Sequence, residues 1–438
     1  MAAETLDGPV IIDLGLDRGE PETYTAPTRS TVPGWFGPLM IVLLVLVSSA
    51  ASAAPPSPPL SRLLTLPVNA SDSYAVTDAG QLLTQNLGTL SSYDLRTGKL
   101  RWQAESVAPT YRLRTGSGVV LLRPWAIGPG QPSTTAISET TGVARWRREG
   151  SVVTIPGSPA LLVVSGVRSL SGYGRRVEGS VEAVDPETGA PRWRVDLPST
   201  AVLMGVPGPA GQPPRMLLVH DNETLAVHDL DTGRLLRTAV VPPAEYEPGN
   251  PGVSGGLIVL RHPGGSGLQI SAYDPVTLHR LWTRPAQGAF EAQPCGPLTC
   301  LAGANGVRAV DPATGTQRWY EPGWRSVEPR GGMLLAYGSP LGISDLIGIV
   351  DPATGRVVAD LRGWRPLPGL AAGDRLLVTR LMDAGARTVV AVAGPGDPRP
   401  RTLTDLPPGT SDCQAAPARL ICRSSAGELT VWAYRRSR

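Results

Sequence analysis

The chain has 438 residues, of which 51 are glycine and 45 are proline. This share approaches the level typical of disordered chains, but 41% hydrophobic residues and ten tryptophans supply enough apolar surface for a folded core. With 18% charged residues and a net charge of +3, the composition argues against a long coiled coil and against a protein that binds nucleic acid through charge.

The first 34 residues form an acidic segment, which we expect to be a disordered cytoplasmic tail. It contains six carboxylates and two arginines, at Glu4, Asp7, Asp13, Asp17, Glu20, Glu22, Arg18 and Arg29. Within it, residues 10–16 are apolar enough to dock on a partner as a short strand or helix. That feature supports one functional hypothesis, a sensor that signals through this tail.

Residues 35–54 carry no charge and have the length of a membrane-spanning helix. We interpret them as an uncleaved signal anchor with the N-terminus inside, because a signal peptide begins with a short cationic region and segment 1–34 is acidic. The alternative is cleavage near Ala51-Ser52-Ala53, which would give a secreted form. The proline-rich residues 55–59 then form a stiff spacer.

One short pattern recurs seven times after residue 60. Its turn position falls every 37–47 residues, at Gly98, Gly142, Gly189, Gly233, Leu278, Gly315 and Gly355. A period of this length indicates a repeat architecture. Each repeat contains short apolar or alternating runs and no helical stretch, which is the pattern of a four-stranded propeller blade.

The repeat centres on a hairpin turn followed by a tryptophan. An aspartate can accept backbone hydrogen bonds in the turn, and a glycine can take the positive φ that closes it. The residues that we assign to the turns and to packing are Asp94, Gly98, Trp102, Asp185, Gly189, Trp193, Asp311, Gly315 and Trp319. We expect each tryptophan to pack between neighbouring blades. Repeats four and seven have Arg237 and Ala359 in its place, so we expect looser contacts there.

A degraded eighth repeat follows at residues 388–403, and two more strands are expected at Arg419–Cys422 and Glu428–Tyr434. We predict that Leu60–Leu66 pairs with Glu428–Tyr434 and closes the ring, because closure removes exposed strand edges. The predicted fold is therefore an all-β propeller over residues 60–438, preceded by one transmembrane helix. We expect about eight four-stranded blades, with seven to nine possible.

These repeats resemble those of the PQQ-like β-propeller family, whose signature is Ala-x-Asp-x-x-Thr-Gly-x-x-x-Trp. Residues 183–193 and 309–319 match it position by position. The resemblance implies the propeller fold. It also implies two functional classes: quinoprotein dehydrogenases, which bind pyrroloquinoline quinone (PQQ) and calcium, and non-enzymatic scaffolds such as the lipoprotein of the outer-membrane barrel assembly machinery. Many membrane-anchored bacterial members have no assigned activity.

We find no catalytic, cofactor-binding or metal-binding motif in the sequence. The dehydrogenases carry two adjacent cysteines against the cofactor, and this chain has none, so neither PQQ nor calcium is expected. His220 and His228 fall on neighbouring predicted strands without metal-site spacing. A GxSxG match at residues 252–256 lies in a loop before a strand, whereas a catalytic serine needs a strand-to-helix turn.

The four cysteines form two local pairs, Cys295 with Cys300 and Cys413 with Cys422. Each pair brackets a short connection between strands, so we predict two disulfides and an oxidising, extracytoplasmic location. The alternative is four buried free thiols. Our leading functional hypothesis is a membrane-anchored, non-catalytic scaffold that binds envelope proteins or peptides through long loops at residues 166–179 and 242–256. The alternatives are a PQQ-dependent dehydrogenase and the sensor.

Overall fold

The computed structural model describes residues 33, 35–51, 60–69, 71–105, 110, 113–123, 133–167, 175–208, 211–244, 250–339, 345–369, 375–383 and 387–434. The chain divides into two compact units, Met1–Ser57 and Pro58–Arg438.

The first unit contains α1 (Phe36–Ala51), which has 16 residues. It begins after Trp35 and covers most of the apolar segment that we predicted as a signal anchor. Among the described residues, no helix combines the length and apolar character required to cross a membrane. Almost all of the acidic segment 1–34, residues 52 and 53 of the alternative cleavage site and the spacer 55–59 lie outside the described residues.

The second unit is all-β, and its strands follow the chain in groups of four that we number as blades. Blades 1 to 4 contain β2 (Tyr74–Val76), β3 (Gln81–Asn86), β4 (Thr89–Asp94) and β5 (Leu100–Ala104); β6 (Arg114–Gly116), β7 (Val119–Leu122), β8 (Ser133–Ser138) and β9 (Ala144–Glu149); β10 (Ser151–Thr154), β11 (Leu161–Val167), β12 (Arg175–Val184) and β13 (Pro191–Asp196); and β14 (Ala201–Val206), β15 (Arg215–His220), β16 (Thr224–His228) and β17 (Leu235–Val240).

Blades 5 to 8 continue the same order around the ring. They contain β18 (Gly252–Ser254), β19 (Leu257–Gly264), β20 (Gly267–Tyr273) and β21 (Arg280–Pro285); β22 (Ala289–Cys295), β23 (Leu298–Gly303), β24 (Gly306–Val310) and β25 (Gln317–Glu321); β26 (Ser326–Arg330), β27 (Met333–Tyr337), β28 (Leu346–Val350) and β29 (Val357–Asp360); and β30 (Arg365–Pro366), β31 (Leu376–Met382), β32 (Arg387–Ala393) and β33 (Arg401–Leu406).

Blade 9 combines the two ends of the propeller. It contains β34 (Thr410–Ala416), β35 (Arg419–Ser424), β36 (Glu428–Tyr434) and the first strand of the unit, β1 (Leu60–Pro67). β1 runs antiparallel to β36, with Leu60 opposite Tyr434 and Pro67 opposite Glu428. This closure by the first and last strands confirms the predicted pairing.

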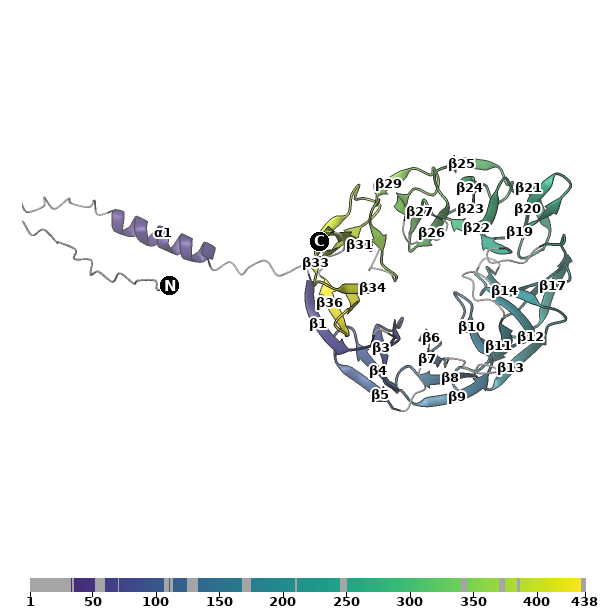
Figure 1. Ribbon diagram of the computed structural model, residues 1–438, viewed down its shortest axis with the longest axis horizontal. Coiled ribbons are helices and arrows are strands. Elements are labelled where there is room, and N and C mark those ends of the chain that lie inside the picture. The colour runs from purple at the N-terminus through teal and green to yellow at the C-terminus, as the bar shows by residue number, and fades with distance from the viewer. Residues whose placement is uncertain are drawn as a thin grey trace, which may run out of the picture. The chain divides into compact units, whose positions relative to one another are not determined.

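The described strands therefore make nine four-stranded groups, which lies within the predicted range and is one more than the preferred number. Within the unit the groups follow one another around a ring, and the fourth strand of each blade lies at the periphery (Figure 1). Blades 3 and 4 are joined into one eight-stranded sheet, because the start of β12 pairs with β14, Arg175 opposite Leu203 and Val177 opposite Ala201.

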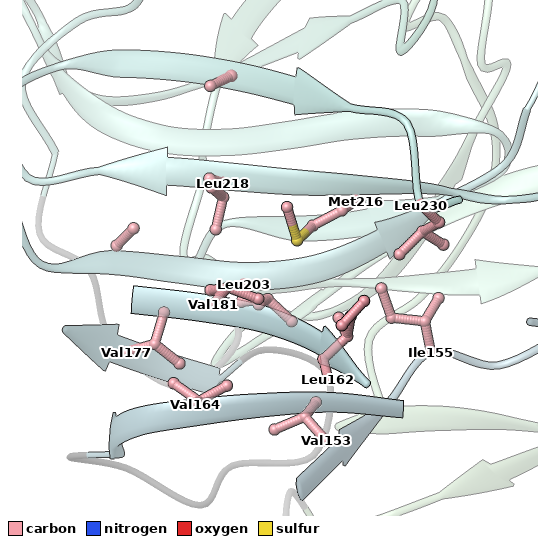
Figure 2. Close-up of a cluster of buried hydrophobic side chains, with 13 residues drawn as sticks. Val153, Ile155, Leu162, Val164, Val177, Val181, Leu203, Met216, Leu218 and Leu230 are labelled. Carbon is pink, nitrogen blue, oxygen red and sulfur yellow. The ribbon is translucent and has the colours of Figure 1, made fainter. Parts of the chain in front are cut away.

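The hydrophobic core lies between neighbouring blades and repeats around the ring. Figure 2 shows one such cluster, in which Leu162 and Val181 of blade 3 lie beside Leu203, Met216 and Leu218 of blade 4. All five side chains are at most 2% exposed. Full burial of each contributes about 1.5–3 kcal/mol, so the stability of a blade depends on the next blade along the chain.

Candidate functional site

The repeated aspartates lie in the hairpin turns between the third and fourth strands of their blades. Asp185 Oδ1 accepts hydrogen bonds from the backbone N–H groups of Glu187 and Thr188 at 2.9 and 3.0 Å. Asp94 and Asp311 accept the equivalent pairs in blades 1 and 6. Each pKa is held below its ordinary value, chiefly by the backbone N–H of Thr97 for Asp94, by Arg192 for Asp185 and by Arg318 for Asp311. These carboxylates therefore act as hydrogen-bond acceptors within their own turns.

Five repeated tryptophans each join their own blade to the following one. Their indole N–H groups donate to a carbonyl oxygen in the turn of the following blade at 2.8–2.9 Å, from Trp102 to Glu139, Trp146 to Pro186, Trp193 to Leu230, Trp282 to Pro312 and Trp319 to Pro352. The rings lie against the turn glycines of those blades, at Gly142, Gly189, Gly233, Gly315 and Gly355. Gly98, in the first blade, instead meets Leu63 of β1.

Blades 4 and 5 depart from this arrangement together. Arg237 stands where blade 4 would carry its tryptophan, and the turn of blade 5 has Leu278 in place of glycine. Leu278 adopts a φ of 58° and is 4% exposed, packed among Val227, Leu225 and other residues of blade 4. A leucine side chain thus occupies this junction in place of the indole ring. At blade 7, Ala359 is 1% exposed within another inter-blade cluster.

Both cysteine pairs form disulfides, which confirms that prediction. Cys295–Cys300 joins the last residue of β22 to the third residue of β23, and Cys413–Cys422 joins directly opposite residues of β34 and β35. The described part of the chain contains no free cysteine. Two disulfides fit an extracytoplasmic location.

The other residues considered for chemistry, Ser254, His220 and His228, are buried within their blades. Ser254, within the GxSxG match, is 2% exposed and donates to the Gln293 carbonyl oxygen at 2.6 Å. His220 and His228 lie at opposite ends of the β15–β16 hairpin, since His220 pairs with Thr224 and His228 with Met216. The described residues bring together no group of three His, Cys, Asp or Glu side chains that could hold a metal ion.

The two predicted contact loops are described only at their edges. Residues 168–174 of the loop 166–179 and residues 245–249 of the loop 242–256 lie outside the described residues. The described parts of these segments include strand residues of β11, β12 and β18.

A cavity of about 530 Å³ lies among the first strands of blades 7, 8 and 9, β26, β30 and β34. It combines polar and apolar surface, and its lining includes Glu328, Arg330, Arg365, Leu381 and Cys413. This volume falls in the range of known ligand sites. We take this cavity, which we call the three-blade cavity, as the candidate binding site.

An internal ion pair forms one side of the three-blade cavity. The Arg330 guanidinium donates to Glu328 Oε1 at 2.5 and 3.1 Å from its two nitrogens, and the Tyr337 hydroxyl donates to Glu328 Oε2 at 2.6 Å. The charge of Glu328 is thereby neutralised within blade 7. Such charge-assisted bonds hold the three side chains in one arrangement.

The connecting segment Pro366–Gly369 forms another side and is held by both neighbouring blades. The Leu367 carbonyl oxygen accepts from Arg330 of blade 7 at 2.7 Å. The Pro368 carbonyl oxygen accepts from the backbone N–H of Ala415 in blade 9, also at 2.7 Å. Gly369 has a φ of 85°, and a Cβ there would lie 2.0 Å from the Ala415 carbonyl oxygen. This wall is therefore fixed before any ligand arrives.

The sequence did not reveal this site because its lining residues come from three blades and lie far apart along the chain. Pro366 and Pro368 around a buried leucine are the one local signal of a rigid connection, and nothing in the sequence places them beside β26 and β34.

Comparison with known proteins extends the sequence argument. Residues 177–322 match the family model described as outer membrane protein assembly factor BamB. No curated protein sequence matches the chain. Among solved structures, BamB from Moraxella catarrhalis is 14% identical, with a TM-score of 0.38 over 86% of this chain and 99% of that one. Quinohemoprotein alcohol dehydrogenase from Comamonas testosteroni is 12% identical, with a TM-score of 0.41 over 87% and 77%.

Those structural scores are too low to carry an argument, so the assignment depends on the repeats and the strand topology. The matched segment runs from β12 in blade 3 to the turn after β25 in blade 6. The same signature and the same four-stranded groups continue on both sides of it. Residues 177–322 thus match the repeats of a PQQ-like β-propeller, and the rest of the propeller resembles this segment in signature and strand topology.

Proposed function

We propose that this protein is a membrane-anchored, extracytoplasmic propeller that binds envelope proteins or peptides as a non-catalytic scaffold. The observation that carries the proposal is the three-blade cavity, a preformed recess whose lining combines apolar and charged side chains. Recesses of this kind suit recognition of a partner segment. The family model's own description, an assembly factor, is consistent with a scaffold role.

Two features support the proposed location. The disulfides favour an oxidising compartment. The large apolar side chains from Trp35 to Val45 are 43–70% exposed along the first part of α1, which favours an apolar environment around this helix. Anchoring through residues 35–54, with the tail 1–34 inside, remains part of the proposal.

The described residues do not fit PQQ and calcium. The cysteines are held in two separate hairpin disulfides, so no adjacent pair can face the quinone. The recurring aspartates are spread one per blade and are committed to turns, which leaves no clustered carboxylates for calcium. We therefore derive no reaction step through this cofactor.

Crosslinking in the native cell envelope tests the scaffold function. A photoreactive amino acid would be placed at Ser411 in the three-blade cavity and, as a control, at exposed Leu87 on the β3–β4 hairpin. The expected result is one abundant adduct at Ser411 that is absent at Leu87, identified by mass spectrometry. Absence of a specific adduct at Ser411 and at further positions around the propeller would refute the scaffold function.

A cofactor assay separates the enzymatic alternative. Purified protein would be mixed with PQQ and calcium, and its melting temperature and visible absorption recorded. We expect neither to change. A saturable thermal shift with a bound-quinone spectrum would favour the dehydrogenase.

A further inference from the structure

We infer that the three-blade cavity binds a short extended peptide segment that is apolar, carries one carboxylate and adds as a strand to the inner edge of β31. The inference rests on the proposed scaffold function and specifies the chemistry of the partner segment.

The inner edge of β31 is incompletely covered. β31 has seven residues, whereas β30, its inner neighbour, has two, with Arg365 opposite Thr379 and Pro366 opposite Val378. The Leu377 carbonyl oxygen accepts from the Leu367 N–H at 2.9 Å, so Leu377 directs its backbone polar groups to this edge.

The backbone polar groups of successive strand residues point to opposite edges. Because Leu381 lies four residues after Leu377, its backbone N–H and C=O point to the same edge. Within the described strands, Leu381 pairs only with Thr388 of β32, on the other edge. An open strand edge beside a cavity is a site where an extended peptide can continue the sheet.

The side chains along this edge specify an apolar segment with one negative charge. Leu381 is 53% exposed and lines the cavity together with Pro366. Arg365 is exposed and has no ion pair or hydrogen bond from its side chain to any described residue.

The remaining charges of the lining are already compensated. Glu328 pairs with Arg330, and Asp412 lies 3.4 Å from Arg423. Arg365 is thus the uncompensated charge among the described lining residues, and a guanidinium pairs preferentially with a planar carboxylate.

The rigidity of the site favours tight binding of a short segment. The Pro366–Gly369 wall is anchored to blade 7 by Arg330 and to blade 9 by Ala415, so little chain needs to be ordered on binding. A cavity of about 530 Å³ accepts a few residues rather than a folded domain.

Selection from a peptide library tests the inference. The probe is a bead-displayed library of acetylated hexapeptides with randomised residues, selected on full-length protein in detergent. We expect enriched peptides with alternating apolar residues and one Asp or Glu. A peptide with an N-methyl group at a position that donates to β31 should bind at least tenfold more weakly, because it loses a backbone hydrogen bond.

Matched variants locate the binding site. R365Q should weaken binding of the enriched peptide about tenfold, and exchange of the peptide's carboxylate for an amide should have the same effect, with little further loss when both are combined. L381S should also weaken binding. The controls are R399Q, at an exposed arginine in the β32–β33 turn, and L268S, at a leucine with 54% exposure on β20; both should bind like the parent.

The outcomes separate this inference from the scaffold function. Enrichment followed by losses in R365Q and L381S alone supports the inference. No enrichment, or binding that these variants do not change, overturns it. If envelope crosslinking still captures a partner at other positions, the scaffold function stands without this site; if no partner is captured anywhere, both fail.

Discussion

The turn glycines set how closely neighbouring blades can approach. At the five junctions that contain a tryptophan, a Cβ on the glycine would lie 2.4–2.8 Å from the indole ring, and the φ of the glycine is 67–74°. Two independent constraints therefore exclude other residues: the positive φ and the contact with the ring. They can be separated because Gly80 has a φ of 73° and open space around it.

Replacing Gly142 with alanine should be markedly more destabilising than replacing Gly80. Both variants force an L-residue into a left-handed conformation, at about 1–2 kcal/mol. Only G142A also drives a methyl group into Trp102, which adds about 1–3 kcal/mol. Urea unfolding measures the two losses, and equal losses would contradict the proposed contact.

The turn aspartates should make the propeller sensitive to acid. Hydrogen bonds to the carboxylates lower their pKa values in the folded chain, so the unfolded chain binds protons more readily. Their stabilisation is complete above the ordinary aspartate pKa of about 3.9 and is lost as pH falls through the lowered folded values.

We therefore expect the melting temperature to decline below about pH 4, and less steeply in a D185N/D311N double variant. D231N is the control, because the Asp231 side chain is exposed and accepts no hydrogen bond from a described residue. A pH profile that is the same in the double variant and the parent would show that the turns do not govern acid stability.

At the scale of elements, the junction between blades 4 and 5 is packed by a leucine instead of a tryptophan. At five other junctions a tryptophan on the outer strand of one blade packs on the glycine of the next turn. Here Leu278 supplies the apolar volume from the turn itself, and Arg237 lies exposed on β17. We infer that the Leu278 side chain compensates for the indole ring that is missing at position 237.

A double-mutant cycle should reveal this coupling. L278G removes the leucine from the core and should cost about 2–5 kcal/mol, while R237W alone places a ring against Leu278 and should destabilise by overpacking. The double variant restores the tryptophan–glycine pair, so its loss should be about 1–3 kcal/mol smaller than the sum of the single losses. Urea unfolding of all four proteins measures the coupling, and additive losses would contradict it.

The sequence predicted this repeat architecture well because the turn pattern is local. Aspartate, threonine and glycine act within one hairpin, so their spacing reveals the third and fourth strands of each blade directly. It did not reveal that Leu278 fills the place of a tryptophan in the preceding blade, because positions 237 and 278 are 41 residues apart and show no shared motif. The three-blade cavity could not be predicted from the sequence either, since β26, β30 and β34 come together only when the ring forms.

At the scale of the whole molecule, closure depends on β1. Deletion of residues 60–67 would expose the outer edge of β36 and the cluster around Leu66, Ile421 and Leu429. Comparing a chain that begins at Pro58 with one that begins at Val68 should show a loss on the order of 3–6 kcal/mol and new self-association in the shorter chain.

Thermal unfolding and light scattering measure these two effects. If the chain that begins at Val68 is as stable and as monomeric as the longer chain, β1 does not close the propeller. A peptide with the sequence of residues 60–67, added in trans, should partly restore stability because it can pair with β36.

The eight-stranded sheet sets a limit on how this propeller can change in size. Most blades are separate sheets, so a gene could gain or lose one repeat and leave the strand ladders of the neighbouring blades intact. Blades 3 and 4 share a ladder through Arg175–Val177 and Ala201–Leu203, and removal of either would leave half of that ladder without a partner. We therefore expect blades 3 and 4 to be duplicated or deleted together, as one unit of two repeats.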